Sequence, residues 1–325
     1  MSMTRQERVA LLFNPAAGKG RAIKAKYQLD RILHKHEILF DLYITQSVQD
    51  LRELARRASL EYETLVGVGG DSTFQIIIDE VMKTGGHPKL GLIGLGSSND
   101  IAREFRVESL NKACSALRKG EIKTIDLGCL GLEEETLLYF LGQANIGLGA
   151  LVNQYIEELS DRKPRLGKRQ KIAGLFCILN AQRSGKVPLR LTIDSVEGRT
   201  EGEFAAAVFS NIRYWATGRL INPGARVDDG YLDACLIRAC SLPRLLHLAL
   251  LAKNGKHITA TEAVFLRSPV FTIRSEQQFT VQADGEIVGG WRTPTVFSEI
   301  QVRAIPGALK LICRGLTQLA RKDIF

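Results

Sequence analysis

The chain has 325 residues, a length that suits about two domains. Its 45% apolar and 24% charged residues exclude wholesale disorder, and its formal net charge of +9 favours anionic partners such as a nucleotide, a nucleic acid or an acidic membrane surface. No apolar run approaches the ~18 residues of a membrane-spanning helix, the N-terminus lacks the apolar stretch of a signal peptide, and the cysteines form no CxxC pair. We therefore expect a cytoplasmic protein whose contact with a membrane, if it has one, is peripheral.

The first third of the sequence alternates strand-like and helix-like segments. Alternation at this spacing is typical of βαβ units and predicts a parallel sheet. We expect an α/β domain whose sheet is covered by helices on both faces and binds ligands at the carboxyl ends of its strands. Strands are predicted at residues 8–13, 38–44, 64–68 and 90–93, and helices at 22–36, 48–58 and 74–82.

After about residue 126 the pattern changes to short strand-like runs. These runs predict a β-rich, sandwich-like second domain, with a boundary near residues 127–131. The predicted strands lie at 189–193, 204–209, 231–237, 270–273, 279–281 and 300–302, and helices are predicted at 172–182 and 242–252.

A glycine-rich loop with one acidic residue, VGVGGDST at 66–73, ends the third predicted strand. Glycines let the backbone approach a ligand closely, and free N–H groups at a helix start attract phosphate. Asp71 suits such a loop if it holds Mg²⁺ or accepts a proton from an attacking hydroxyl. The simpler interpretation is that Asp71 caps the next helix.

Two further loops lie at the same expected edge. The loop GLGSSND at 94–100 offers hydroxyl and amide groups, and Asp100 can cap the following helix. The loop NPAAGKGR at 14–21 is not a P-loop, but the cation Lys19 would neutralise phosphate there.

The second domain adds two acidic clusters, VDDGYLD at 227–233 and ADGE at 283–286. Each could be a plain turn, because Asp-Gly favours tight turns. Together with the three loops they favour phosphoryl transfer, which depends on positioning and charge neutralisation, and Mg²⁺, which prefers oxygen ligands.

The order of six motifs resembles that of the bacterial diacylglycerol kinase and lipid kinase family. The motifs are NPAAGKG, GVGGDST, GLGSSND, IDLG at 125–128, VDDGYLD and ADGE. This family is similar to sphingosine, ceramide and eukaryotic diacylglycerol kinases in its catalytic region. The resemblance covers almost the whole chain. It implies an active site in the cleft between the domains and a final segment that returns to the first domain. The domains would then comprise residues 1–128 with 309–325, and 129–308.

The resemblance also implies an ATP- and Mg²⁺-dependent kinase that phosphorylates the hydroxyl of a lipid such as diacylglycerol, presented at a membrane surface. Asp71 would act as base or in the magnesium network, with Glu286 joining that network, and Asp229 would hold a magnesium ion. Asp126 would support Lys19 by pairing with it. Lys24 would also support the site, and the residues around ATP would be Asn14, Lys19, Gly70, Asp71, Ser72, Thr73, Ser97 and Asn99.

The sequence departs from the family pattern on the nucleotide side. GGDST replaces GGDGT, and GSSND replaces GTxND, so Ser72 and Ser98 stand at altered positions. If Ser72 needs a positive φ, it costs about 1 kcal/mol in strain. The departures favour a second hypothesis, a lipid- or nucleotide-binding homologue with impaired catalysis. A third, weaker hypothesis is an NAD kinase, which shares the GGDGT type of loop. No nucleic-acid-binding module is recognisable, and a homodimer is left open.

Overall fold

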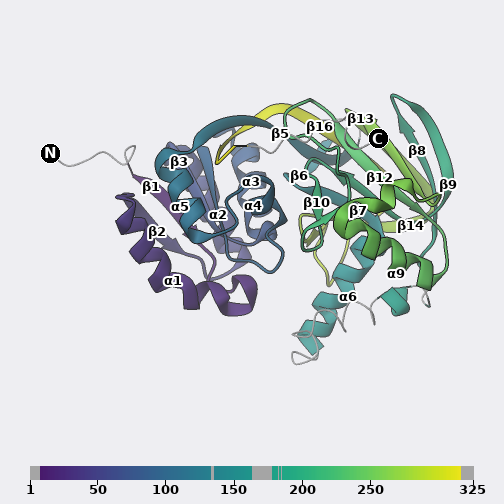
Figure 1. Cartoon of the computed structure of the whole chain (residues 1–325), viewed down its shortest axis with the longest axis horizontal. Coiled ribbons are helices and arrows are strands. Elements are labelled where there is room, and N and C mark those ends of the chain that lie inside the picture. Colours follow the sequence, from purple (N-terminus) through teal and green to yellow (C-terminus); the bar gives the residue numbers. More distant parts are fainter. Residues whose placement is uncertain (1–7, 133–134, 163–177, 182, 184, 316–325) are drawn as a thin grey trace.

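The computed structural model of the chain describes residues 8–132, 135–162, 178–181, 183 and 185–315. Its first part alternates strands and helices, as predicted (Figure 1). The elements are β1 Val9–Phe13, α1 Ala17–Lys35, β2 Phe40–Ile44, α2 Val48–Glu61, β3 Thr64–Gly69, α3 Asp71–Thr84, β4 Lys89–Gly94, α4 Asp100–Glu104 and α5 Leu110–Lys119.

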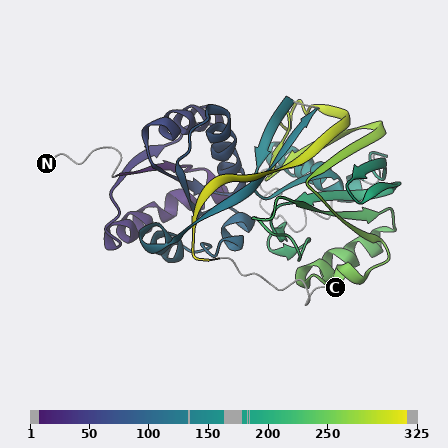
Figure 2. The same cartoon turned by 90° about the horizontal axis from the view of Figure 1, so that it is seen from above.

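The strands of this first domain form a parallel sheet. Strand β1 pairs with β2 and β3, and β3 pairs with β4, all in parallel. Helix α2 packs on α3 and α1 packs on α5, and Figure 2 shows helices on either side of the strands. Because both faces of the sheet are covered, its central strands are almost entirely buried and apolar.

The second part of the chain is β-rich, and its described strand pairs are antiparallel. The helix predicted at 172–182 lies mostly outside the described residues, whereas α6 was not predicted. The elements are β5 Glu121–Leu132, β6 Glu135–Phe140, β7 Gln143–Gly147, α6 Leu148–Arg162, β8 Leu189–Ser195, β9 Gly198–Ser210, β10 Tyr214–Trp215, β11 Arg219–Leu220, β12 Leu232–Arg238, α9 Leu242–Leu251, the 3₁₀ helices η2 Ala252–Asn254 and η3 Lys256–Thr259, β13 Ala263–Ser268, β14 Val270–Ala283, β15 Glu286–Ile287 and β16 Val296–Cys313.

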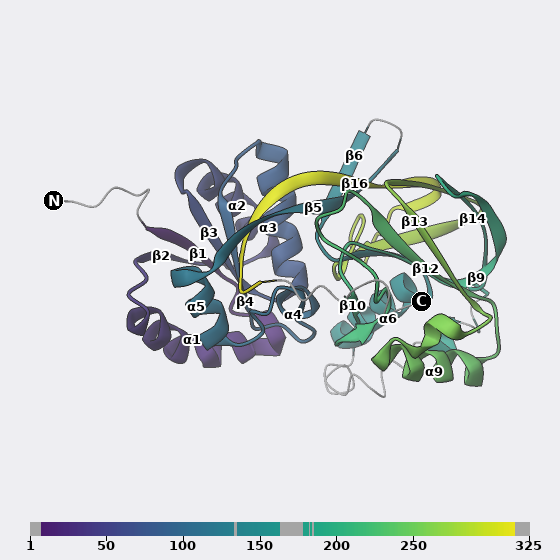
Figure 3. The same cartoon turned by 45° about the horizontal axis from the view of Figure 1, so that its top comes forward.

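Two long strands, β5 and β16, run through both domains (Figure 3). They pair antiparallel along most of their length. In the second domain β16 also pairs with β14, and in the first it pairs in parallel with β4. Strand β16 therefore adds to the parallel strands of the first domain. The domain boundary predicted at 127–131 falls inside the unbroken strand β5. Among the described helices, none is both long and apolar enough to cross a membrane.

Candidate active site

The loops that follow β1, β3 and β4 meet at one edge of the parallel sheet. Asn14, directly after β1, donates from Nδ2 to Thr73 Oγ1 in the first turn of α3, at 3.0 Å. The other two loops touch through their backbones, since a Cβ added to Gly96 would lie 2.4 Å from Gly70 Cα. The structure thus brings together Asn14, Gly70 and Thr73, as the motif order implies.

The loop that carries Lys19 has an unusual backbone. Gly18, Lys19 and Gly20 have φ values of 60°, 59° and 83°, in the left-handed region. A side chain at Gly18 would place Cβ 2.3 Å from the carbonyl oxygen of Leu95, so only glycine fits against the neighbouring loop. The regular part of α1 therefore begins after Gly20, and Lys19 lies at the edge where the loops meet.

Asp71 begins α3 and binds the start of another helix. Its carboxylate accepts the backbone N–H groups of Asp100 at 3.1 Å and Ile101 at 3.2 Å, in the first turn of α4. Burial raises the pKa of Asp71 to about 7, and the charges of Asp100 and Asp284 add to the rise. The carboxylate is therefore fixed in place and titrates near neutral pH, as a general base requires.

Asp100 caps a turn of the second domain rather than its own helix. Its carboxylate accepts the N–H groups of Thr217 at 3.0 Å and Gly218 at 2.7 Å, in a turn whose residues have positive φ. Ser98, one of the altered loop residues, donates to the same carboxylate at 2.5 Å and accepts from Thr217 N at 2.8 Å. The side chain of Ser98 therefore joins the two domains.

The DGE segment begins with a fully enclosed carboxylate. Asp284 is 2% exposed and accepts the backbone N–H groups of Leu141, Gly142 and Gln143 at 2.8–3.0 Å. Burial raises its pKa to about 6 although these donors lower it. Asp284 was not predicted as a site residue, and its three donors show that it fixes the turn that presents Glu286.

Glu286 follows this turn and lies against α3. The Ser72 hydroxyl acts on the Glu286 carboxylate and lowers its pKa, and a Cβ placed on Gly285 would lie 3.5 Å from Ser72 Cβ. Burial raises the pKa of Glu286, and the nearby charge of Glu157 raises it further. The second altered residue, Ser72, is thus also a contact between the domains.

Glu157, on α6, is a member of this group that the sequence did not reveal. Its side chain is exposed, yet partial desolvation by the surrounding protein raises its pKa, and the positive charge of Lys19 lowers it. Since Glu157 also acts on Glu286, this carboxylate of α6 lies near both Lys19 and the DGE turn. No local motif marks Glu157, and the only available signal was the polar face of α6.

Asp126 binds backbone groups of two turns. Its carboxylate accepts the N–H of Gly230 at 2.6 Å and that of Gly307 at 2.8 Å. It is 3% exposed and lies within β5. These contacts hold the VDDGYLD loop and the kink of β16 in place. They do not involve Lys19, so the supporting role expected for Asp126 stays a prediction.

Asp229 has partners that do not suit a magnesium ion. Its Oδ2 contacts the guanidinium of Arg267, Arg226 Nε lies 4.0 Å from the same oxygen, and its Oδ1 accepts Tyr231 N at 3.2 Å. A divalent cation bound to this carboxylate would have to displace or repel two guanidinium groups. We therefore derive no chemical step through a metal at Asp229.

We expect the stability of the protein to depend on Arg267 rather than on magnesium. Arg267→Gln should lower the free energy of unfolding by about 1–2 kcal/mol, because it removes the nearer of the two guanidinium groups that face a largely buried carboxylate. Addition of Mg²⁺ or of a chelator should leave the melting temperature of the unaltered protein unchanged. A melting temperature that rises with Mg²⁺ and falls with chelator would contradict this assignment.

Three predicted residues remain, Ser97, Lys24 and Asn99. Ser97 is exposed, and Lys24 is exposed on α1. Asn99 has a φ of 55°, donates from Nδ2 to Gly96 O at 3.0 Å, and has a buried Oδ1 without a hydrogen-bond partner. Asn99 therefore keeps an acceptor available where the glycine loops meet.

Comparisons with known proteins match this architecture. Residues 8–130 match the model of the diacylglycerol kinase catalytic domain, and residues 142–313 match that of the YegS C-terminal NAD kinase beta sandwich-like domain. A diacylglycerol kinase of Staphylococcus carnosus is 25% identical over 293 residues, which cover 87% of this chain and 90% of that protein. One of Staphylococcus epidermidis is 24% identical over 299 residues, or 91% and 90% of the two chains.

Solved structures share the fold. A crystal structure described as a diacylglycerol kinase from Bacillus anthracis superposes with a TM-score of 0.68 at 16% identity, over 96% of this chain and 98% of that one. A second structure from the same organism, with the same coverage, gives a TM-score of 0.73 at 19% identity. The two matched domains, the motif order and the loop geometry agree, and the chain belongs to the diacylglycerol kinase family of lipid kinases.

Proposed function

We propose that the chain transfers the γ-phosphoryl group of ATP to the hydroxyl of a diacylglycerol-like lipid in the cleft between its domains. The observation that carries this proposal is the meeting of three glycine loops from the first domain with the DGE turn of the second. The loops offer backbone N–H groups and Lys19 to phosphates. Asp71 and Glu286 supply carboxylates at the same place.

In the proposed reaction the lipid hydroxyl gives its proton to Asp71. Its oxygen forms a bond to the γ-phosphorus, and the bond from that phosphorus to the bridging oxygen of ATP breaks, which leaves ADP. The raised pKa of Asp71 supports this role, since a base with a pKa near 7 accepts a proton readily at neutral pH. Lys19 would neutralise charge on the phosphates.

The proposed magnesium ion would arrive with ATP. When bound, it would offset negative charge on the phosphates, as Mg²⁺ generally does with one or two carboxylates and several waters. Glu286 and Glu157 fit that need, because their mutual repulsion raises the pKa of Glu286 and a cation would relieve it. Within the described residues, no group of three or more His, Cys, Asp or Glu side chains could hold a metal unaided, so the phosphates would complete the ligand set.

The contacts of Ser72 and Ser98 count against the hypothesis of impaired catalysis. Ser72 lies inside α3 and is not among the residues with positive φ, so the strain anticipated for it does not arise. Both serines interact with the second domain: Ser72 acts on Glu286, and Ser98 accepts a hydrogen bond from Thr217 N. We propose that these serines help to fix the closed arrangement of the domains.

We expect activity to fall at acidic pH because the base must be ionised. With a pKa of about 7 for Asp71, the rate of the chemical step should rise about tenfold per pH unit below neutrality and level off above it. Stability should show the opposite trend. The pKa is raised from 3.8, so the contribution of Asp71 to stability is lost as the pH rises from about 4 to 7.

Two measurements over this pH range check the prediction. Single-turnover rates from pH 5.5 to 8.5 report the chemical step, and urea unfolding from pH 4 to 8 reports stability. The unaltered protein should lose stability relative to Asp71→Asn as the pH rises. A rate that does not change between pH 6 and 8 would exclude Asp71 as the base.

The experiment that tests the function is transfer of labelled phosphate from Mg·ATP to a mixed lipid extract. Label in a lipid that depends on the intact protein would establish the kinase and identify its substrate class. No labelled product at high protein concentration, with both ATP and GTP tried, would favour a binding protein. Conversion of labelled NAD to NADP would instead favour the NAD kinase alternative.

A further inference from the structure

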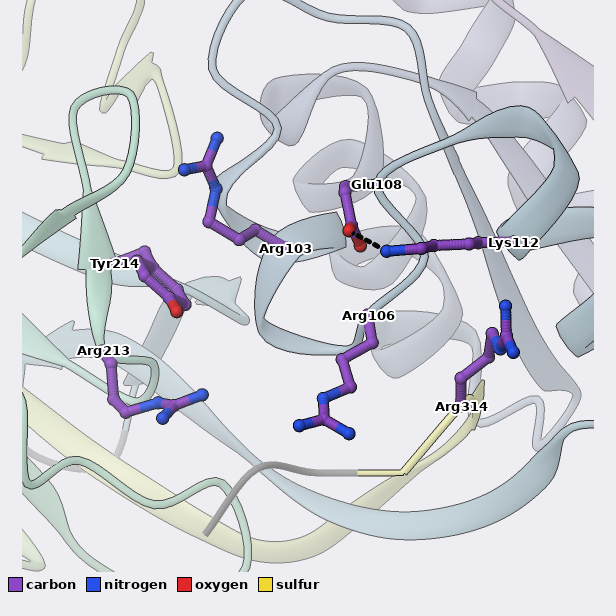
Figure 4. Close-up of a pocket in the computed structure, with 7 residues that line it drawn as sticks. All are labelled: Arg103, Arg106, Glu108, Lys112, Arg213, Tyr214 and Arg314. Carbon is purple, nitrogen blue, oxygen red and sulfur yellow. Dashed lines mark hydrogen bonds and ion pairs between the residues drawn. The ribbon is translucent and has the colours of Figure 1, made fainter. Parts of the chain in front are cut away.

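A strongly basic cavity lies apart from the loops that form the candidate active site. It is found where the end of α4, the start of α5 and the end of β16 approach β10 of the second domain (Figure 4). Its volume is about 420 Å³, within the range of small-ligand pockets. We call it the basic pocket, and it is lined by Arg103, Arg106, Glu108, Lys112, Arg213, Tyr214 and Arg314.

Three of its five cations form no ion pair with an acidic side chain among the described residues. Lys112 pairs with Glu108 of the pocket, and Arg213 pairs with Glu104 just outside it. The other three, Arg103, Arg106 and Arg314, form no ion pair within the part of the chain that the structure describes, although the charge of Arg103 acts on Glu108 and lowers its pKa. Figure 4 shows Arg106 between Arg213 and Arg314, around a common space. Such an excess of positive charge in one cavity attracts an anion.

The side chains of the second domain are held in position before any ligand binds. Arg213 is 5% exposed, and its Nη2 lies 2.9 Å from Glu104 Oε1, while its backbone N donates to the same carboxylate at 3.1 Å. The Tyr214 ring has the guanidinium carbons of Arg103 and Arg213 at 5.6 Å and 5.4 Å from its centroid. The side of the pocket formed by Arg213 and Tyr214 would therefore need little rearrangement to bind a ligand.

The guanidinium groups that line the basic pocket indicate which class of ligand it can bind. Guanidinium groups bind phosphate oxygens in pairs of parallel hydrogen bonds, which a monoester with three terminal oxygens can satisfy from several directions. We propose that the basic pocket binds a dianionic phosphate monoester and so forms a second anion site beside the active site. The volume leaves room for a small substituent such as glycerol.

A bound monoester would bridge the two domains. Arg106 and Arg314 extend from the first domain, whereas Arg213 belongs to the second. The pocket lies at the end of α4, and the start of the same helix contacts Asp71. With five residues α4 is about 7 Å long, so an occupant would act on the segment that orients the proposed base.

Two sources supply this chemistry, a soluble metabolite and a lipid headgroup. The soluble arm measures binding of inorganic phosphate and of glycerol 3-phosphate to the full-length protein by calorimetry. The lipid arm measures sedimentation with phosphatidylcholine vesicles that contain phosphatidate, or an equal charge of phosphatidylglycerol, which is a diester. Phosphatidate is also what the proposed reaction would yield, but neither arm requires catalysis, so failure of the proposed function leaves this test valid.

Variants separate the basic pocket from the phosphate loops. Arg106→Gln and Arg314→Gln should each weaken monoester binding about tenfold, as loss of a charge-assisted hydrogen bond does. Arg190→Gln, an exposed position on β8, is the control of equal charge and should leave binding unchanged. Lys19→Gln should also leave this binding intact, because Lys19 belongs to the other site.

The outcomes decide the proposal. Loss of soluble monoester binding in both pocket variants supports a metabolite site, and loss of preference for phosphatidate over phosphatidylglycerol supports a headgroup site. The proposal is overturned if neither arm detects binding, or if Arg190→Gln weakens binding as much as the pocket variants. It is also overturned if binding disappears only in Lys19→Gln. If one pocket variant fails to fold, the other carries the test.

Discussion

Asp71→Asn is expected to lower the rate of lipid phosphorylation by about 10²- to 10⁴-fold, the usual contribution of a general base. The amide cannot take the proton of the lipid hydroxyl. It still presents one oxygen to the N–H groups of Asp100 and Ile101, so loss of one cap contact should lower the free energy of unfolding by only about 1 kcal/mol. Single-turnover phosphorylation and urea unfolding measure the two effects.

A matched control distinguishes catalysis from capping. Asp50 in the first turn of α2 also accepts a backbone N–H, that of Gln46 at 2.8 Å, but lies away from the glycine loops. Asp50→Asn should give a comparable, small loss of stability and full activity. If Asp71→Asn retains more than a tenth of the activity, Asp71 serves only to cap α4.

Asp284→Ala is expected to lower the free energy of unfolding by about 3 kcal/mol or more. It removes the acceptor of three buried N–H groups, and each unsatisfied donor costs about 1–3 kcal/mol. Asp284 also has a φ of 46°, a conformation that alanine adopts at an additional cost of roughly 1–2 kcal/mol. Urea unfolding at pH 7 measures the loss.

Asp284→Asn is the informative comparison. Asparagine tolerates a left-handed backbone and keeps one acceptor oxygen, so this variant should lose clearly less stability than the alanine variant. Equal losses in the two variants would mean that the carboxylate charge, and not the acceptor oxygen, stabilises the turn. A loss below 1 kcal/mol in Asp284→Ala would contradict the structural role altogether.

The parts of the site that could be predicted are those with a local signal. Strands β1, β3 and β4 are short apolar runs. Strand β1 is followed by Asn14, and β3 and β4 end in Gly69 and Gly94. Parallel strands bring their carboxyl ends to one edge, so the meeting of Asn14 with Thr73 follows from the order of the elements. The same reasoning places Gly70 near the loop after β4.

The parts that could not be predicted depend on contacts between distant segments. Asp284 binds N–H groups about 140 positions earlier in the chain, and Asp100 binds a turn near residue 217. Glu157 joins the site from a helix whose sequence carries no motif. Asp-Gly pairs and single glutamates are common in turns and on helix surfaces, so no spacing rule distinguishes these residues from ordinary ones.

Strand β16 joins the parallel strands of the first domain to the antiparallel strands of the second, so the first domain is completed late in synthesis. Strand β4 at Lys89–Gly94 leaves the ribosome long before residues 310–311, its neighbours in the finished sheet. Until then the nascent first domain has an open strand edge, where another chain could pair. The first domain is therefore completed only after nearly all of the second domain has been translated, and we expect a fragment that ends near residue 130 to aggregate rather than to fold as an isolated domain.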